Sequence, residues 1–210
     1  MINFVFMYRI FFIISLIFLI NVSHLLAQQF QTIELGVQCP GTSIEMISVD
    51  GVTHTLDNHF SKKGLLVVFT SNTCPFVVAW EDRYKMVEGI CEENNVDMLY
   101  INSNHNKRDG DDSFEEMKNH AKFNGYKYPY LLDEKSKLAN TFGAKTTPHI
   151  FLFDSTKKLV YLGAIDDNYK SVDNVSAFYL KDAIESLVSG NEIQPSQTKA
   201  VGCSIKRYKP

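Results

Sequence analysis

The 210-residue sequence predicts an α/β fold in which a central mixed β-sheet is flanked by helices and preceded by an N-terminal β-hairpin. The first observation is the continuous apolar run at 64–70, which is typical of a strand buried on both faces. The second is the helical spacing of apolar residues that follows Pro75 and lasts to about Asn94. The third is the chain order. Strand–helix–strand followed later by hairpin–helix places helices on both faces of one sheet.

Local signals support each element in turn. Asp50-Gly51 separates two alternating segments within 43–56, and an Asp-Gly pair in that setting predicts a hairpin. Pro75 suits the first turn of a helix, where its missing N–H costs nothing. The later elements predicted in chain order are a strand at 96–102, a helix capped by Asp112 or Ser113 and stopped by Gly125, an extended segment at 128–133, a short helix at 136–143, a hairpin of 149–154 and 158–163, and a final amphipathic helix at 175–190.

The first 27 residues differ in composition from the rest of the chain. Arg9 precedes an apolar stretch from Ile10 to Ile20, and polar residues then lead to the small residue Ala27. This order is typical of a secretory signal peptide. The alternative is an uncleaved membrane anchor, although the apolar stretch is shorter than the roughly 20 residues of a bilayer span. We therefore expect residues 1–27 to be a signal peptide and the protein to be periplasmic or secreted, or membrane-anchored if this segment is retained.

The exported part is predicted to be one domain at 28–190, followed by a polar C-terminal tail at 191–210. A net charge of −3 and the lack of a basic stripe with interleaved aromatics argue against nucleic-acid binding. The four cysteines follow no metal-ligand spacing, and we predict neither a metal site nor a cofactor. Asp166, Asp167 and Asn168 are interpreted as exposed charge in a loop rather than as metal ligands.

Cys74 lies between the apolar strand and Pro75, which opens the helix. The N-terminus of a helix offers unsatisfied N–H groups and a positive dipole end, and both favour the thiolate over the thiol. We therefore expect a lowered pKa for Cys74 and a nucleophilic role, with Ser71 and Thr73 shaping its pocket. The alternative is that Cys74 is a small core residue. Cys91 lies on the apolar stripe of the same helix and is predicted to be core.

Several short motifs in a fixed order resemble those of a known family. They are VVFTSNTCPF (67–76), WEDR (80–83), INSN (101–104), DSFEEMK (112–118), PYLLDE (129–134), GAKTTPHIFLFD (143–154), GAIDDN (163–168) and GCSIK (202–206). The set resembles the redoxin branch of the thioredoxin superfamily, and more closely the peroxiredoxin-like thioredoxin-family proteins of bacteria. The resemblance covers Leu35 to Lys206 and implies a thioredoxin-like fold and a bacterial periplasm as the compartment.

The resemblance also gives a role to Thr147-Pro148. In thioredoxin-like proteins the matching proline is cis and packs beside the reactive cysteine, and the residue before it presents its backbone to an extended substrate chain. Thr147 and Pro148 are therefore expected to bind substrate opposite Cys74. The alternative is an ordinary loop with a trans proline.

The sequence departs from the family pattern in the second sulfur of the redox pair. Thioredoxin-type dithiols place it three residues after the first, where Val77 stands, and close relatives place it three residues before, where Ser71 stands. A disulfide within the motif is therefore impossible. Cys203, on a tail expected to be mobile, is our first choice to resolve an oxidised Cys74, and Cys39 is the other. Cys203 as an unpaired thiol or an intermolecular bridge stays open.

A second departure concerns peroxide chemistry. Ser71 matches the Thr or Ser that peroxiredoxins keep three residues before their cysteine. They also keep an arginine on the later hairpin, and the nearest positions here, Tyr161 and Ala164, are not cationic. Without that cation, the thiolate and the developing charge of peroxide cleavage lose a charge-assisted partner. We therefore expect weak peroxidase activity.

These observations predict an exported thiol oxidoreductase that uses Cys74 as its nucleophile in thiol–disulfide exchange or antioxidant reduction. Its partner would be a thiol or disulfide protein or a small peroxide, and the sequence identifies neither the reductant nor the oligomeric state. The alternatives are a peroxiredoxin-like peroxidase of weak activity and a non-catalytic binding module of the thioredoxin fold.

Overall fold

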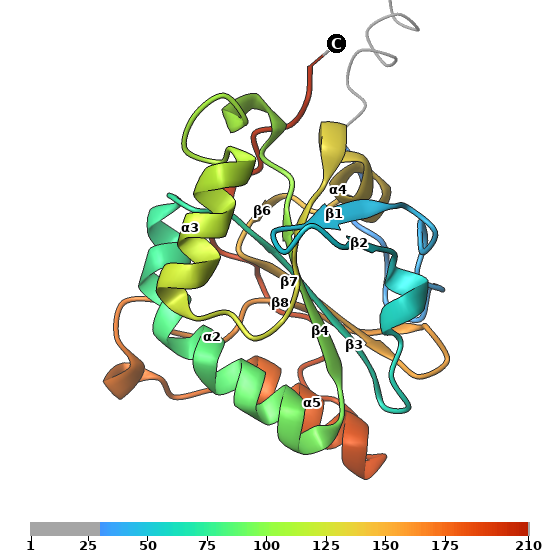
Figure 1. Ribbon diagram of the computed structural model, residues 1–210. Coiled ribbons are helices and arrows are strands. Elements are labelled where there is room, and N and C mark those ends of the chain that lie inside the picture. Colours follow the sequence, from blue (N-terminus) through green and yellow to red (C-terminus); the bar gives the residue numbers. More distant parts are fainter. Residues whose placement is uncertain (1–29, 210) are drawn as a thin grey trace, which may run out of the picture. The chain divides into compact units, whose positions relative to one another are not determined.

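A computed structural model of the chain describes residues 30–209, so the predicted signal peptide at 1–27 lies outside the described residues. Seven strands form one mixed sheet in the order β2-β1-β5-β4-β3-β7-β8 (Figure 1). The strands of this sheet are β1 (Met46–Ser48), β2 (Thr53–His54), β3 (Gly64–Thr70), β4 (Asp97–Asn102), β5 (Tyr130–Leu132), β7 (His149–Asp154) and β8 (Leu159–Gly163). The other two strands, β6 (Thr146–Thr147) and β9 (Cys203–Ser204), pair with each other. The α-helices are α2 (Pro75–Asn94), α3 (Phe114–Asn124), α4 (Lys137–Phe142) and α5 (Tyr179–Ser189).

The longest strand, β3, lies inside the sheet between β4 and β7. It runs parallel to β4 on one side and antiparallel to β7 on the other, and all seven of its residues are buried. The predicted N-terminal hairpin is present as β1 and β2, and β1 extends the sheet by pairing antiparallel with β5. The predicted α/β fold with a mixed sheet flanked by helices is therefore confirmed.

The alternation of side chains along β3 divides the core into two clusters, one on each face of the sheet. Leu66 and Val68 point to the face covered by α2, α3 and α5. Leu65, Val67 and Phe69 point to the face covered by α4 and the segment before β1. Among the described residues, no helix is long and apolar enough to cross a membrane.

Most predicted helix ends are confirmed, but the last helix is shorter than its sequence pattern suggested. Ser113 caps α3 by accepting a hydrogen bond from the backbone of Glu116, and Gly125 ends that helix. The predicted start at 175 is wrong, because α5 begins at Tyr179. The backbone of Ser176 is tied instead to the side chain of Asp167, 2.9 Å away, so it does not join the helix.

The C-terminal segment differs most from its prediction. We expected a mobile polar tail after residue 190, but the described residues of this segment belong to the same compact unit as the preceding domain. Thr198 donates its N–H to the carbonyl of Leu162 at 3.0 Å, and β9 pairs with β6. These contacts join residues far apart in sequence, and they need no periodic pattern of apolar side chains in the tail itself.

Candidate active site

The end of β3 and the start of α2 place Cys74 as the sequence predicted. Cys74 is the N-cap residue of α2, with an extended backbone, and Pro75 is the first helical residue. Cys74 belongs to the core cluster on the α2 face, and the residue is 6% exposed. The cysteine is therefore held at a helix N-terminus by a buried strand on one side and a twenty-residue helix on the other.

Two groups from distant parts of the chain approach the sulfur of Cys74. The Sγ atom of Cys203 lies 2.7 Å away, and the carbonyl oxygen of Thr147 lies 3.1 Å away. Cys203 is only partly buried, so the pair has one enclosed sulfur and one that is more accessible. The structure thus brings together the predicted nucleophile, the first-choice resolving cysteine and the residue before the predicted cis proline.

The electrostatics of the pair are asymmetric. Burial alone would raise the pKa of Cys74, but hydrogen bonds from the Cys203 thiol, the Val77 backbone N–H and the Thr147 side chain outweigh it and lower that pKa. Burial and the hydrogen bond to Cys74 raise the pKa of Cys203 to about 11. The pKa of Cys74 is therefore the lower of the two, so Cys74 loses its proton more readily than Cys203.

The strand pair β6–β9 delivers Cys203 to this position. Thr147 is directly opposite Cys203, and Thr146 is opposite Ser204, in an antiparallel register. The Thr147-Pro148 peptide bond is cis, which confirms the prediction for this bond. Thr147 therefore contacts both cysteines, with its carbonyl near the Cys74 sulfur and its backbone paired to Cys203.

The other residues predicted for the site are placed differently. Ser71 is buried, and its hydroxyl lies 3.3 Å from that of Thr147, so it contacts the residue beside the sulfur. Thr73 is exposed. Cys39 lies in the core cluster on the opposite face, where its N–H donates to Lys157 in the β7–β8 turn at 2.7 Å. The structure therefore does not bring Cys39 together with Cys74.

The two remaining buried thiols are poor nucleophiles. Burial raises the pKa of Cys39 to about 12, and it does the same for Cys91, which is fully enclosed on α2. His149, which follows the cis proline, is a buried strand residue, and burial lowers its pKa to about 4. Among the described residues, no group of three or more His, Cys, Asp or Glu side chains could hold a metal ion.

A buried polar network behind the Cys74 loop was missed by the sequence reasoning. One Asp112 oxygen accepts from the Asn72 backbone N–H at 2.9 Å and from the Asn102 amide at 2.7 Å, and the other accepts from the Asn104 amide at 2.9 Å. The Asn104 side-chain oxygen in turn accepts from the backbone N–H of Lys206 at 2.8 Å. The network therefore fixes the loop before Cys74 and the chain after Cys203 together. The asparagines of the INSN motif were the available signal.

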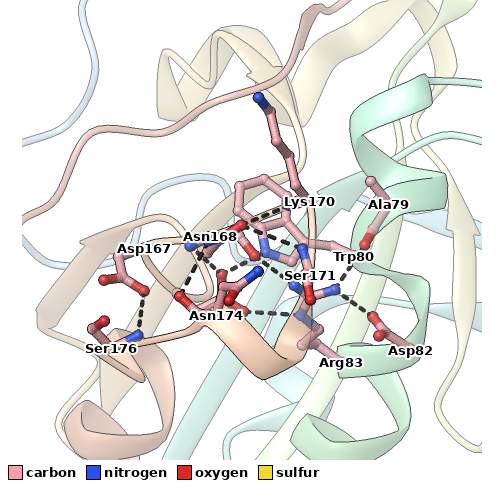
Figure 2. Close-up of polar contacts among 11 residues, drawn as sticks. Ala79, Trp80, Asp82, Arg83, Asp167, Asn168, Lys170, Ser171, Asn174 and Ser176 are labelled. Atoms are coloured by element: carbon pink, nitrogen blue, oxygen red, sulfur yellow. Dashed lines mark hydrogen bonds and ion pairs between the residues drawn. The ribbon is translucent and has the colours of Figure 1, made fainter.

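A second missed feature is the ion pair that joins α2 to the loop after β8. Trp80 and Arg83 of α2 face this loop, as Figure 2 shows for Arg83 and Asn168. Asp166 accepts from Trp80 Nε1 at 2.9 Å and from Arg83 Nε at 3.1 Å, and Arg83 also donates to the carbonyl of Asn168 at 2.5 Å. The interpretation of Asp166 as exposed loop charge is wrong. It is 2% exposed because the Trp80 and Arg83 donors satisfy its carboxylate inside the protein.

The chain is similar in sequence and in fold to known proteins. The family model described as Redoxin matches residues 34–178. Two solved structures are similar over most of their length. A hypothetical protein from Sinorhizobium meliloti 1021 is 29% identical, with 86% of this chain and 98% of that chain covered at a TM-score of 0.78. An uncharacterized conserved protein from Geobacillus kaustophilus is 31% identical, with 84% and 93% covered at a TM-score of 0.77.

A more distant structure shares the fold. Peroxidoxin BcpB from Mycobacterium tuberculosis is 16% identical, with 75% of this chain and 97% of that chain covered at a TM-score of 0.58. No curated protein matches the chain in sequence.

Proposed function

The chain belongs to the redoxin family of the thioredoxin superfamily, and on that premise we propose that it is an exported thiol–disulfide oxidoreductase whose redox pair is Cys74 and Cys203. The observation that carries the proposal is the 2.7 Å separation of the two sulfurs. A disulfide bond is about 2.05 Å long, so the pair needs only a small side-chain movement to form one. The family's second sulfur, absent from the motif around Cys74, is thus supplied by the C-terminal chain.

The chemistry follows from the asymmetry of the pair. The Cys74 thiolate attacks one sulfur of a substrate disulfide, a new S–S bond forms, and the other substrate sulfur leaves as a thiolate. Cys203 then loses its proton to solvent and attacks the Cys74 sulfur, which releases the second substrate thiolate. The substrate gains two electrons, and the enzyme is left with a Cys74–Cys203 disulfide. A dithiol reductant returns it to the starting state, and the reverse sequence oxidises a substrate dithiol.

The raised pKa of Cys203 suits this order of events. Burial first, and then the hydrogen bond to Cys74 and the charge of Cys74, raise the pKa of Cys203 and favour its protonated form. Once Cys74 is held in a mixed disulfide, it no longer carries the negative charge that favoured protonation of Cys203. Formation of the first bond therefore removes the contribution of Cys74 to the raised pKa of Cys203, while the contribution of burial remains.

Peroxide reduction is the second candidate, and the nearness of Cys203 favours it to a limited extent. A sulfenic acid on Cys74 would condense with Cys203 and lose water to give the same disulfide. However, the hydrogen bonds that lower the pKa of Cys74 come from the Cys203 thiol, the Val77 N–H and the Thr147 side chain, all neutral groups. Among the described residues, no cation contributes to the lowered pKa of Cys74, and neutral donors stabilise the charge of peroxide cleavage less than a cation does.

The test compares three variants in two assays, reduction of insulin with dithiothreitol as the electron source and consumption of hydrogen peroxide. Cys74→Ser is expected to lose insulin reduction, and Cys203→Ser is expected to lose turnover while still forming a mixed disulfide. Cys39→Ala is the matched control and should retain the activity, because Cys39 lies on the other face of the sheet. Wild-type turnover by Cys203→Ser contradicts the proposed pair, and rapid peroxide consumption without insulin reduction favours the peroxidase. Activity in neither assay favours the binding module.

N-terminal sequencing of the mature protein tests cleavage near Ala27.

A further inference from the structure

The segment 198–207, here called the strap, crosses the site and is anchored on both sides of Cys203. At its first end, the Thr198 hydroxyl accepts from the backbone N–H of Ala164 at 2.9 Å, and the Thr198 N–H donates to Leu162. At its other end, Lys206 donates its N–H to the side chain of Asn104 at 2.8 Å. In Figure 1 the C-terminal chain, in red, continues past β6 to the end marked C.

Between these anchors the strap is seated as an added β-strand. Its residues Cys203 and Ser204 form β9, which pairs antiparallel with β6, and this register sets the sulfur of Cys203 against Cys74. A short strand whose backbone groups pair with one extended chain can pair with another in the same way. The strap therefore occupies the edge at which an extended peptide would meet the Cys74 sulfur.

The fit of the strap depends on the absence of a side chain at Gly202. A Cβ atom at this position would lie 2.2 Å from the carbonyl oxygen of Thr147 and 3.1 Å from the nitrogen of Pro148. Both are backbone atoms, which cannot rotate aside as the end of a flexible side chain can. The edge beside Cys74 therefore accepts a cysteine that glycine precedes, and it excludes larger residues at the preceding position.

We propose that the strap is a tethered copy of the peptide that β6 binds. A partner protein takes its place as an extended segment with glycine immediately before its reactive cysteine, and it gains access to Cys74 only when the strap has left the edge. The proposal rests on the proposed function and adds its partner class. Cys74 attacks the partner's cysteine sulfur, whose former bonded sulfur leaves as a thiolate. The strap then displaces the partner's segment from β6, and Cys203 loses its proton to solvent, attacks the Cys74 sulfur and releases the partner's cysteine as a thiolate.

The test uses the full chain with Cys203→Ser, so that Cys74 is the only thiol of the pair, and two synthetic peptides. Each peptide carries one cysteine activated as a mixed disulfide with thionitrobenzoate, whose release is followed by absorbance, and glycine or valine precedes that cysteine. We expect the glycine peptide to react faster by about tenfold or more, the rate difference that a backbone clash in one peptide would give. Equal rates for the two peptides would overturn the selectivity.

Release of the strap is tested with a second substitution in the same Cys203→Ser chain. Gly202→Val should accelerate reaction with the glycine peptide several-fold, because the added side chain displaces β9. Gly110→Val is the matched control, since a Cβ there meets open space. Lys206→Pro removes the N–H donated to Asn104 and should accelerate the reaction as well, which keeps the test valid if Gly202→Val folds poorly. If neither variant reacts faster than the control, the strap does not close the edge.

Failure of the proposed function gives a different result in the same experiment. Iodoacetamide labelling of Cys74 is measured in parallel at pH 7 in the two strap-release variants, Gly202→Val and Lys206→Pro, so that the strap does not shield the sulfur. If Cys74 is labelled no faster than free cysteine, the catalytic role itself fails, whatever the peptides do. If Cys74 is labelled rapidly but the two peptides do not differ, the redox role stands and only the partner class is overturned.

Discussion

Removal of the Asp166 carboxylate should weaken the attachment of α2 to the sheet. Asp166 is buried between Trp80 and Arg83, and its two oxygens accept from these side chains at 2.9 and 3.1 Å. The side chains of Arg83 and Asp166 are 2% and 0% exposed. The substitution Asp166→Ala therefore leaves a buried guanidinium without this counter-charge and a buried indole N–H without an acceptor.

The expected cost follows from these two losses. Removing one partner of a buried ion pair costs about 3–5 kcal/mol, and an orphaned buried donor accounts for about 1–3 kcal/mol of such a loss. Arg83 keeps its hydrogen bonds to the carbonyls of Ala79 and Asn168 and its exposed partner Asp82, so the lower end applies. We expect the free energy of unfolding to fall by about 3 kcal/mol, which lowers the Tm by roughly 6–12 °C in a domain of this size.

Urea unfolding monitored by circular dichroism measures this change, with the slope against denaturant compared between variants. The matched control is Asp82→Ala, which removes the other carboxylate of Arg83. Asp82 is 57% exposed, so this change should cost about 1 kcal/mol or less. If Asp166→Ala costs no more than Asp82→Ala, the burial of the pair does not stabilise the protein as we reason, and the account of how α2 is fixed is wrong.

Three further predictions concern the site and the sheet. Cys203→Ala should raise the pKa of Cys74, because the hydrogen bond that favours the thiolate is lost, and the pH midpoint of iodoacetamide labelling should move upward; an unmoved midpoint contradicts this reasoning. Burial lowers the pKa of His149 from 6.5 to about 4, so the unfolded chain takes up the proton first as the pH falls. The free energy of unfolding should therefore decrease by up to about 3 kcal/mol between pH 6.5 and 4, and His149→Asn should remove this component from the pH dependence of urea unfolding. Gly64→Ala should lower the free energy of unfolding, measured by thermal unfolding, by about 2 kcal/mol or more. The reason is that φ at Gly64 is +139° and a Cβ atom there would lie 2.1 Å from a backbone oxygen of β7. Gly89→Ala is the control and should not lower the free energy of unfolding, because a Cβ atom there meets open space.

The parts of the fold and site that sequence could predict are those with local causes. The apolar run of β3 and the helix-opening Pro75 fix the position of Cys74 within a few residues of chain, and both are visible in the sequence. The Asp50-Gly51 turn and the cap at Ser113 are local signals of the same kind. The cis bond before Pro148 was expected from the resemblance to thioredoxin-like proteins, and the structure contains it.

The parts that sequence could not predict depend on contacts between distant residues. The burial of Asp166 is explained by Arg83, which lies 83 positions earlier on another element. Cys203 could be named as a partner for Cys74, but its position depends on backbone pairing with Thr147 and on the space left by Gly202. The sequence of the tail has no periodic pattern that predicts either contact. A polar segment that is held by backbone hydrogen bonds has the same kind of sequence as a polar segment that is mobile.

The most direct test of the central claim is a peptide map of the mildly oxidised protein, obtained by mass spectrometry without reduction and after alkylation of free thiols. The pairing of the two sulfurs at 2.7 Å predicts one intramolecular disulfide between Cys74 and Cys203, with Cys39 and Cys91 recovered in alkylated form. A disulfide from Cys74 to any other cysteine, or an oxidised protein in which Cys74 and Cys203 are never linked, would contradict it.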